Sequence, residues 1–260
     1  IDLYENGYRT EHINCINTPV AVGAGYFDYN YYYIYSFIDA INRNWNYEFY
    51  KKTDWYSLCK KFLQVIGLNF FKHSVFDKES FVETIRNEIT NEKPTILIAT
   101  YSSVPWCRGY LEDDTEHGYL ITGFHTKKPV FLLRDDFILR YSDNENVEKH
   151  LEPIFKGNPS WKFQITEDIL FDIWKNSNKV HMEKQRIFQN QIYSIGKSEN
   201  FEKTSPAEIL QYLICIIDLN NNCLEDIIKT QQYYINLDEE GLNNSFDIFR
   251  RDLVSSLRII

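Results

Sequence analysis

A change in hydrophobic period about a third of the way along the chain constrains its fold most strongly. Residues 77–91 carry an apolar side chain at every fourth position (Phe81, Ile85 and Ile89), which predicts a helix with one buried face. Residues 94–101 then form a short apolar and β-branched run after a proline, which is typical of a buried strand. The chain therefore changes from helical to extended structure within a few residues.

The elements around this change keep the same order, with helices first and strands second. Helical regions are predicted over residues 15–42 and over residues 54–66, where the second ends at Gly67. Strands are predicted over residues 118–124 and 130–134, with a short turn between them. Helices followed by a small antiparallel sheet predict an α+β fold.

The remainder of the chain again shows helical periodicity. The predicted helices cover residues 166–177, 181–193, 205–218, 221–235 and 245–258. We therefore expect a core over residues 1–145 and a helical extension over residues 146–260 that covers the core, joined by a linker within residues 144–159.

Composition limits the partners and the compartment. The chain has 260 residues and a net charge of −9, whereas nucleic-acid binding needs a surplus of Lys and Arg. Its five cysteines are odd in number and lack CxxC spacing, which argues against a zinc site or a disulfide framework and favours a reducing, cytoplasmic environment. No apolar run reaches the roughly 18–20 residues of a membrane span, and no signal-peptide pattern follows Ile1.

Three residues that carry chemistry stand at the ends of predicted elements. Cys15 precedes a helix, His117 begins a strand, and Asp135 ends the next strand. A thiol at a helix N-terminus beside a histidine is readily ionised, and a carboxylate fixes the imidazole of such a histidine. The order predicts a nucleophile, its base and the group that orients the base. Asp136 is the alternative carboxylate, and Asp135 is preferred because it is the first residue past the strand.

Each of these residues also has an ordinary interpretation. A cysteine near an apolar helix is usually a small buried hydrophobe, and a histidine at a strand edge or an Asp pair in a turn needs no function. Cys15 and His12 are close enough in sequence to be two metal ligands, but no second pair accompanies them, and we predict no metal.

Around these residues the chain resembles the C39-peptidase-like superfamily of papain-fold proteins. There, an early Cys opens a helix, and a strand of the type His-Tyr-Val-Val-Val-Gly-Tyr is followed by a strand that ends in Asp. The corresponding stretches here are Asn14-Cys15-Ile16-Asn17-Thr18-Pro19, His117-Gly118-Tyr119-Leu120-Ile121-Thr122-Gly123-Phe124 and Phe131-Leu132-Leu133-Arg134-Asp135-Asp136. The resemblance covers about residues 8–140 and is greatest to the butirosin-H-like branch, which adds a C-terminal helical extension.

This resemblance implies a function. Members of the branch are acyltransferases of natural-product assembly, including nonribosomal peptide-like antibiotics, that move an acyl chain from a carrier-protein thioester to an amine. The donor is then a phosphopantetheine thioester, an acyl or peptidyl carrier protein is the partner, and no other cofactor is expected. Candidate carrier-docking patches are the lysine pairs 51–52, 60–61 (with Lys72) and 127–128, and the acidic run 112–116 is a candidate site for a cationic amine.

The chain departs from the peptidase members of the superfamily at the oxyanion site. Arg9 replaces a glutamine of bacteriocin-processing relatives, so the backbone N–H of Cys15 is expected to act with Arg9, His12 or Asn14. Tyr119 and Asp136 are further candidates for the substrate site. Two alternatives stay open: a cysteine peptidase or amidase of the same fold, and a binding protein on a degenerate peptidase scaffold. The sequence leaves the oligomeric state undetermined.

Overall fold

The computed structural model describes residues 13–45, 47–136, 152–156, 161–198, 204–205, 207–209 and 211–212. The chain divides into two compact units. The first unit contains residues 1–32 and 68–201, and the second contains residues 33–67 and 202–260. We describe each unit by itself.

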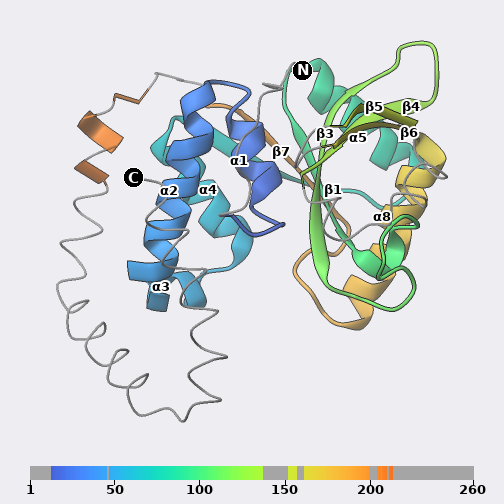
Figure 1. The fold of residues 1–260 in the computed structure, drawn as a ribbon, viewed down its shortest axis with the longest axis horizontal. Coiled ribbons are helices and arrows are strands. Elements are labelled where there is room, and N and C mark those ends of the chain that lie inside the picture. Colours follow the sequence, from blue (N-terminus) through green and yellow to red (C-terminus); the bar gives the residue numbers. More distant parts are fainter. Residues whose placement is uncertain are drawn as a thin grey trace, which may run out of the picture. The chain divides into compact units, whose positions relative to one another are not determined.

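A seven-stranded sheet forms the centre of the first unit (Figure 1). Its strands are β1 (Leu68–Ser74), β2 (Thr95–Thr100), β3 (Glu116–Phe124), β4 (Val130–Asp135), β5 (Glu152–Lys156), β6 (Trp161–Thr166) and β7 (Gln191–Lys197). They lie in the order β1-β7-β2-β3-β4-β6-β5, and every neighbouring pair is antiparallel. With the helices that accompany it, the sheet makes the fold α+β, as the sequence predicted.

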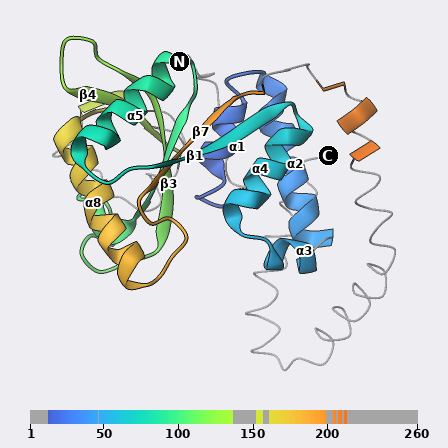
Figure 2. The same cartoon turned by 180° about the vertical axis from the view of Figure 1, so that it is seen from behind.

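Helices α5 (Lys78–Thr90) and α8 (Glu167–Glu183) cover one face of this sheet, and both run beside it in the two opposite views (Figure 1 and Figure 2). Because side chains alternate between the faces of a strand, alternate residues of β2, β3, β4 and β6 join the core under these helices. The helices contribute Phe81, Ile85, Ile89, Leu170, Ile173 and Trp174 to this core, and the strands contribute Leu97, Ala99, Tyr119, Ile121, Phe131, Leu133, Phe163, Ile165 and Ile192.

Local sequence signals explain where these two helices begin. The Asp77 side chain accepts a hydrogen bond from the backbone N–H of Ser80, and the Ser80 hydroxyl bonds back to the Asp77 backbone, which makes a capping box. Thr166, the last residue of β6, caps α8 by accepting from the backbone N–H of Ile169 at 3.3 Å. The chain therefore turns directly from β6 into α8.

Helix α1 (Thr18–Ala24) packs on the opposite face of the sheet. Pro19 lies in its first turn, where a missing N–H costs nothing. Gly23 has no room for a larger side chain, because a Cβ atom there would lie 2.8 Å from Cδ1 of Ile195 and 3.5 Å from Cδ1 of Leu120. The small residues of this segment thus allow the helix to approach the sheet closely.

The second unit contains most of helix α2 (Tyr29–Trp45), which begins in the first unit, together with α3 (Tyr47–Lys52) and α4 (Trp55–Val65). Asp54 caps α4 through the backbone N–H of Ser57, at 3.0 Å. In the interior of this unit, the Tyr35 hydroxyl donates to the sulfur of Cys59 at 3.3 Å. Burial raises the pKa of Cys59, which makes this thiol a poor nucleophile.

The predicted elements of the core fall close to observed ones, apart from three differences, one of which is that helix α3 was not predicted. The helical region predicted over residues 15–42 is interrupted after Ala24, so it forms α1 and α2 rather than one helix. The strand β1 follows Gly67 and was not predicted. Leu68 and Phe70 are buried at alternate positions, but Phe71 directly follows Phe70 and the last three residues are polar, so the sequence itself shows no simple alternation.

The prediction of a helical extension over residues 146–260 is wrong for its first part. Within that range, β5, β6 and β7 join the same sheet as the core, so the predicted linker 144–159 contains a strand and the predicted helix 181–193 gives way to β7. Arg186 donates its backbone N–H to the carbonyl of His181 and closes the end of α8. Residues 207–209 and 211–212 are helical, but the rest of the predicted helix 205–218, and those over 221–235 and 245–258, lie outside the described residues.

Candidate active site

Cys15 lies in a tight turn that leads into α1. The carbonyl of Asn14 accepts hydrogen bonds from the backbone N–H groups of Asn17 (3.2 Å) and Thr18 (3.0 Å), and the Asn14 side-chain oxygen accepts a second bond from the Asn17 N–H at 2.7 Å. The Thr18 hydroxyl donates to the same Asn14 carbonyl at 3.0 Å. These bonds fix the turn from both of its ends, and the Cys15 side chain within it is a free, partly exposed thiol.

Backbone contacts hold this turn against β3. The backbone N–H of Gly118 donates to the carbonyl of Cys15 at 3.3 Å, and the Cys15 thiol donates to the carbonyl of Glu116 at 3.5 Å. The pairing of β3 with β4 begins only at Leu120 and Arg134, so the turn takes the place beside β3 that β4 does not reach. The nucleophile candidate therefore lies at the edge of the strand that carries His117.

Gly118 makes this approach possible. A Cβ atom on Gly118 would lie 2.6 Å from Cγ of Pro19 and 3.0 Å from the carbonyl oxygen of Cys15, both closer than ordinary contacts. A glycine at this place lets the first turn of α1 lie directly on the strand.

His117 is buried, with 1% of its surface exposed, and both of its ring nitrogens are engaged. Nε2 lies 2.9 Å from Oδ1 of Asp135, and Nδ1 lies 3.2 Å from the hydroxyl oxygen of Tyr101. An ionised carboxylate only accepts hydrogen bonds, so Nε2 must carry a proton. Nδ1 is consequently the nitrogen that exchanges protons with a reacting group.

The charges around His117 favour its protonated form. Burial disfavours the imidazolium, but the negative charge of Asp135 and its hydrogen bond, together with a hydrogen bond to Cys15 and the charge of that thiol, raise the pKa of His117 to about 10. At neutral pH the imidazolium thus faces the thiol, which is the arrangement that activates a cysteine nucleophile.

The structure also distinguishes the two neighbouring carboxylates. Because successive side chains of a strand point to opposite faces, Asp135 and Asp136 point in opposite directions. Asp135 contacts His117, whereas Asp136 accepts hydrogen bonds from Nε (2.9 Å) and Nη2 (2.7 Å) of Arg134. Arg134 and Asp136 are both buried, so Asp136 serves as the partner of a buried cation.

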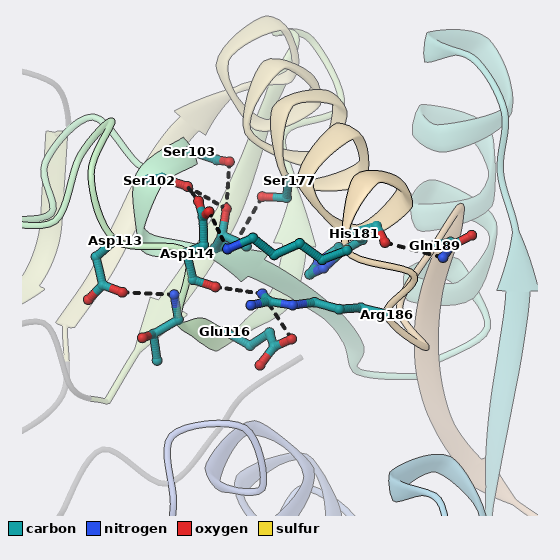
Figure 3. Close-up of polar contacts among 12 residues, drawn as sticks. Ser102, Ser103, Asp113, Asp114, Glu116, Ser177, His181, Arg186 and Gln189 are labelled. Atoms are coloured by element: carbon teal, nitrogen blue, oxygen red, sulfur yellow. Dashed lines mark hydrogen bonds and ion pairs between the residues drawn. The ribbon is translucent and has the colours of Figure 1, made fainter.

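The turn after α8 holds the loop that precedes β3 (Figure 3). Nη1 of Arg186 donates to the carbonyl of Asp114 at 2.5 Å and lies 3.0 Å from the carboxylate of Glu116. The Asp114 carboxylate binds Nζ of Lys184 at 2.7 Å and accepts from the hydroxyl of Ser102 at 2.5 Å. This network fixes the backbone immediately before the histidine, including the carbonyl that accepts from the Cys15 thiol.

The other predicted site residues have varied outcomes. Arg9 and His12 lie outside the described residues. Asn14 is exposed, and its side-chain oxygen is bound to Asn17. The ring of Tyr119 contacts the imidazole edge-on, with centroids 4.7 Å apart. Burial, followed by the charge of the nearby carboxylate, raises the pKa of Tyr119 well above its ordinary value, so its hydroxyl stays neutral.

Sequence reasoning missed Tyr101 and Arg186. Tyr101 is the last residue of the predicted strand 94–101, and its contact with His117 follows only once the register of β2 and β3 is known. Arg186 lies in a segment that was expected to be helical, and no local signal marks it.

Comparisons with family models, with curated proteins and with solved structures gave no match to this chain. Among the described residues, no cluster of three or more His, Cys, Asp or Glu side chains is arranged to hold a metal ion. No helix in the described part of the chain combines the length and the apolar character that crossing a membrane requires.

Proposed function

We propose that this protein is a cysteine-dependent acyltransferase that forms an amide by way of an acyl group on Cys15. One observation carries the proposal. His117 is anchored on the buried Asp135 through Nε2, while the turn that holds Cys15 is hydrogen-bonded to the same strand as the histidine. This arrangement supplies a nucleophile, a proton donor and acceptor, and a group that orients it.

In the first half-reaction, the Cys15 thiolate attacks the carbonyl carbon of a thioester. A new bond forms between that carbon and the Cys15 sulfur, and the bond to the donor's sulfur breaks. The leaving thiolate takes the proton from Nδ1 of His117, which leaves a neutral imidazole still bound to Asp135 through Nε2.

In the second half-reaction, a neutral amine attacks the acyl carbon. The new carbon–nitrogen bond forms, the bond to the Cys15 sulfur breaks, and the amine gives a proton to Nδ1 of His117. Loss of the thiolate charge during the acyl-enzyme stage removes one of the causes that raise the pKa of His117, so the imidazole stays neutral more readily and can accept a proton at the step that needs a base.

The thioester donor, the carrier protein and a role in natural-product assembly are proposed from the resemblance to the C39-peptidase-like superfamily. The same resemblance supports a papain-like interpretation of the α+β core. The oxyanion would be held by the backbone N–H of Cys15 and a side chain. Because the Asn14 side-chain oxygen is held by Asn17, its amide nitrogen is the part of Asn14 free to serve as that donor.

The acidic run 112–116 contributes less to an amine site than its charge suggests. Asp114 and Glu116 are already bound to Lys184 and Arg186, respectively. Glu112 and Asp113, which are exposed, are the members of the run that we propose for holding a cationic amine.

Intact-protein mass spectrometry tests the function. The protein is mixed with a carrier protein that bears a β-alanyl thioester, and the same is done with Cys15→Ala and with the control Cys59→Ser. We expect one added acyl group on the wild type and on Cys59→Ser, and none on Cys15→Ala. Discharge of the acyl group by a primary amine to give an amide supports transfer.

Two results would contradict the proposal in different ways. Release of the acyl group by water at the same rate with and without amine would indicate a hydrolase. If a panel of thioesters leaves no adduct, and iodoacetamide does not react with Cys15 faster than with an ordinary thiol, the covalent mechanism is refuted.

A further inference from the structure

Nδ1 of His117 has two candidate partners, and the proposed function uses only one of them. The Tyr101 hydroxyl lies 3.2 Å from this nitrogen, and Cys15 lies close enough to the same imidazole to raise its pKa. The phenol is therefore placed at the nitrogen through which every proton of the reaction must pass.

The antiparallel register explains why Tyr101 is there. Ala99 pairs with His117, and the backbone N–H of Tyr101 donates to the carbonyl of Thr115 just beyond the end of β2. Tyr101 and His117 are thus diagonal neighbours on one face of the hairpin. Their rings stack with centroids 5.1 Å apart and an angle of 30°, and Tyr119 covers another side of the imidazole.

We propose that Tyr101 is a positioning residue that holds Nδ1 of His117 during the acyl-enzyme stage and so prepares the imidazole to receive the proton of the incoming amine. This inference rests on the proposed function. It assigns Tyr101 to the second half-reaction rather than to the first.

The protons on His117 differ between the two stages of the reaction. In the proposed first half-reaction both ring nitrogens of His117 carry hydrogen, and the attacking Cys15 thiolate is an acceptor for the one on Nδ1. After acylation, Nδ1 is an unprotonated acceptor in a buried site, and the thioester sulfur of Cys15 has no hydrogen to donate. A buried acceptor without a donor is costly.

A tyrosine hydroxyl suits both stages, because it is a donor and an acceptor and can rotate its hydrogen. In the acyl-enzyme the Tyr101 hydroxyl donates to Nδ1, which keeps the imidazole in its plane until the amine arrives. The amine N–H then replaces it. A phenylalanine would keep the stacked ring and lose this hydrogen bond.

The groups that face His117 come from four segments. They are Asp135 at the end of β4, Tyr119 on β3, Tyr101 after β2 and Cys15 before α1. Asp135 binds Nε2 in both stages and the Tyr119 hydroxyl stays neutral, so at His117 the loss of the Tyr101 hydroxyl acts on Nδ1.

The first test needs no substrate. Cys15→Ala removes the thiol, so the neutral imidazole depends on Tyr101 as it does in the acyl-enzyme. ¹⁵N spectra of His117 are recorded against pH for Cys15→Ala and for Cys15→Ala with Tyr101→Phe. We expect the second variant to lose the ¹⁵N chemical shift that is typical of a hydrogen-bonded Nδ1. We also expect the pKa of His117 to be higher in this variant by roughly 0.5–1 unit. Identical titrations would overturn the inference.

The second test separates the half-reactions with p-nitrophenyl acetate as donor and butylamine as acceptor. Tyr101→Phe should keep its burst of nitrophenol within about threefold of the wild-type rate, while the amine-dependent steady-state rate falls about tenfold or more. Tyr193→Phe is the matched control, since it removes another buried phenol hydroxyl, one that donates to Gln191.

The outcomes are distinguishable. If the wild type shows no burst, the proposed acyl-enzyme fails, and the ¹⁵N titration still decides the role of Tyr101. If the burst appears and Tyr101→Phe leaves the amine-dependent rate unchanged, the proposed function stands and the role of Tyr101 is refuted.

Discussion

Replacing Gly118 by alanine should separate Cys15 from His117 without touching either residue. The new Cβ atom would lie 2.6 Å from Cγ of Pro19, whereas ordinary contact begins at 3.4 Å, so the first turn of α1 must retreat by about 0.8 Å. The carbonyl of Cys15, which would lie 3.0 Å from that Cβ, must move as well. The Gly118 hydrogen bond to Cys15 lengthens from its present 3.3 Å.

The magnitude follows from this displacement. Moving a reacting group by about 1 Å costs on the order of 10²-fold in rate, and overpacking a close contact costs about 1–3 kcal/mol of the free energy of unfolding. We therefore expect Gly118→Ala to fold, with a modest loss of stability, and to react with iodoacetamide at Cys15 about 10- to 100-fold more slowly at pH 7.

The assay pairs the alkylation rate, followed by mass spectrometry, with urea unfolding. Gly123→Ala on the same strand is the control, because its Cβ would press on the Leu132 side chain at 3.0 Å and not on the Cys15 turn. Gly123→Ala should lose similar stability and keep the wild-type alkylation rate. If Gly118→Ala keeps that rate, or if both variants lose it equally, the reasoning is refuted.

Two further predictions concern charge. Asp135→Asn should slow acylation of the thiol by about 10²-fold or more, because the imidazole loses its anionic anchor. Asp136→Asn should instead cost about 3–5 kcal/mol of the free energy of unfolding, because the buried Arg134 loses that anion. Urea unfolding and the burst rate are measured for both variants, and similar results for the two would contradict the assignment. Burial lowers the pKa of His181 to about 4, below its ordinary 6.5. The unfolded chain therefore binds a proton first, stability falls as the pH drops from 6.5 towards 4, and at pH 4.5 the loss is roughly 2 kcal/mol. Unfolding of His181→Gln at pH 7 and 4.5 should show a smaller loss than the wild type, and an equal loss would refute this account.

The part of the site that could be predicted is the part set by local pattern. Cys15, His117 and Asp135 stand at the ends of segments whose periodicity is clear, and the observed β3 and β4 begin and end within two residues of the predicted strands. A residue at the end of a strand is placed near others at the same edge of the sheet whenever the strands are neighbours. The proximity of His117 and Asp135 therefore follows from the sequence pattern, whereas the place of Cys15 beside β3 and the contacts of all three residues do not.

The strands that were missed depend on partners distant in the chain. The short strand β6 pairs with β4 along its whole length, and that pairing defines it. The chain also reverses at Gln185 and Asn190, which are non-glycine residues with positive φ values of 52° and 53°. Gln is not a turn signal, and Asn190, although Asn tolerates this conformation, directly precedes β7, so the helical pattern was extended through the turn.

The same reasoning explains why Tyr101 and Arg186 could not be assigned from sequence. Both residues lie near the start of β3. Tyr101 is placed there by the register between β2 and β3, and Arg186 by the turn that follows α8. His117 pairs with Ala99 of β2 through its backbone, and its imidazole is anchored on Asp135 at the end of β4. The nucleophile instead sits in a turn attached to the free edge of that strand by few hydrogen bonds. A rigid base and a more weakly held nucleophile suit covalent chemistry in which the sulfur must move between thiolate and thioester while the imidazole keeps its place. If so, substitutions in the Asn14–Asn17 turn should alter the rate at which Cys15 is acylated far more than they alter the protonation of His117.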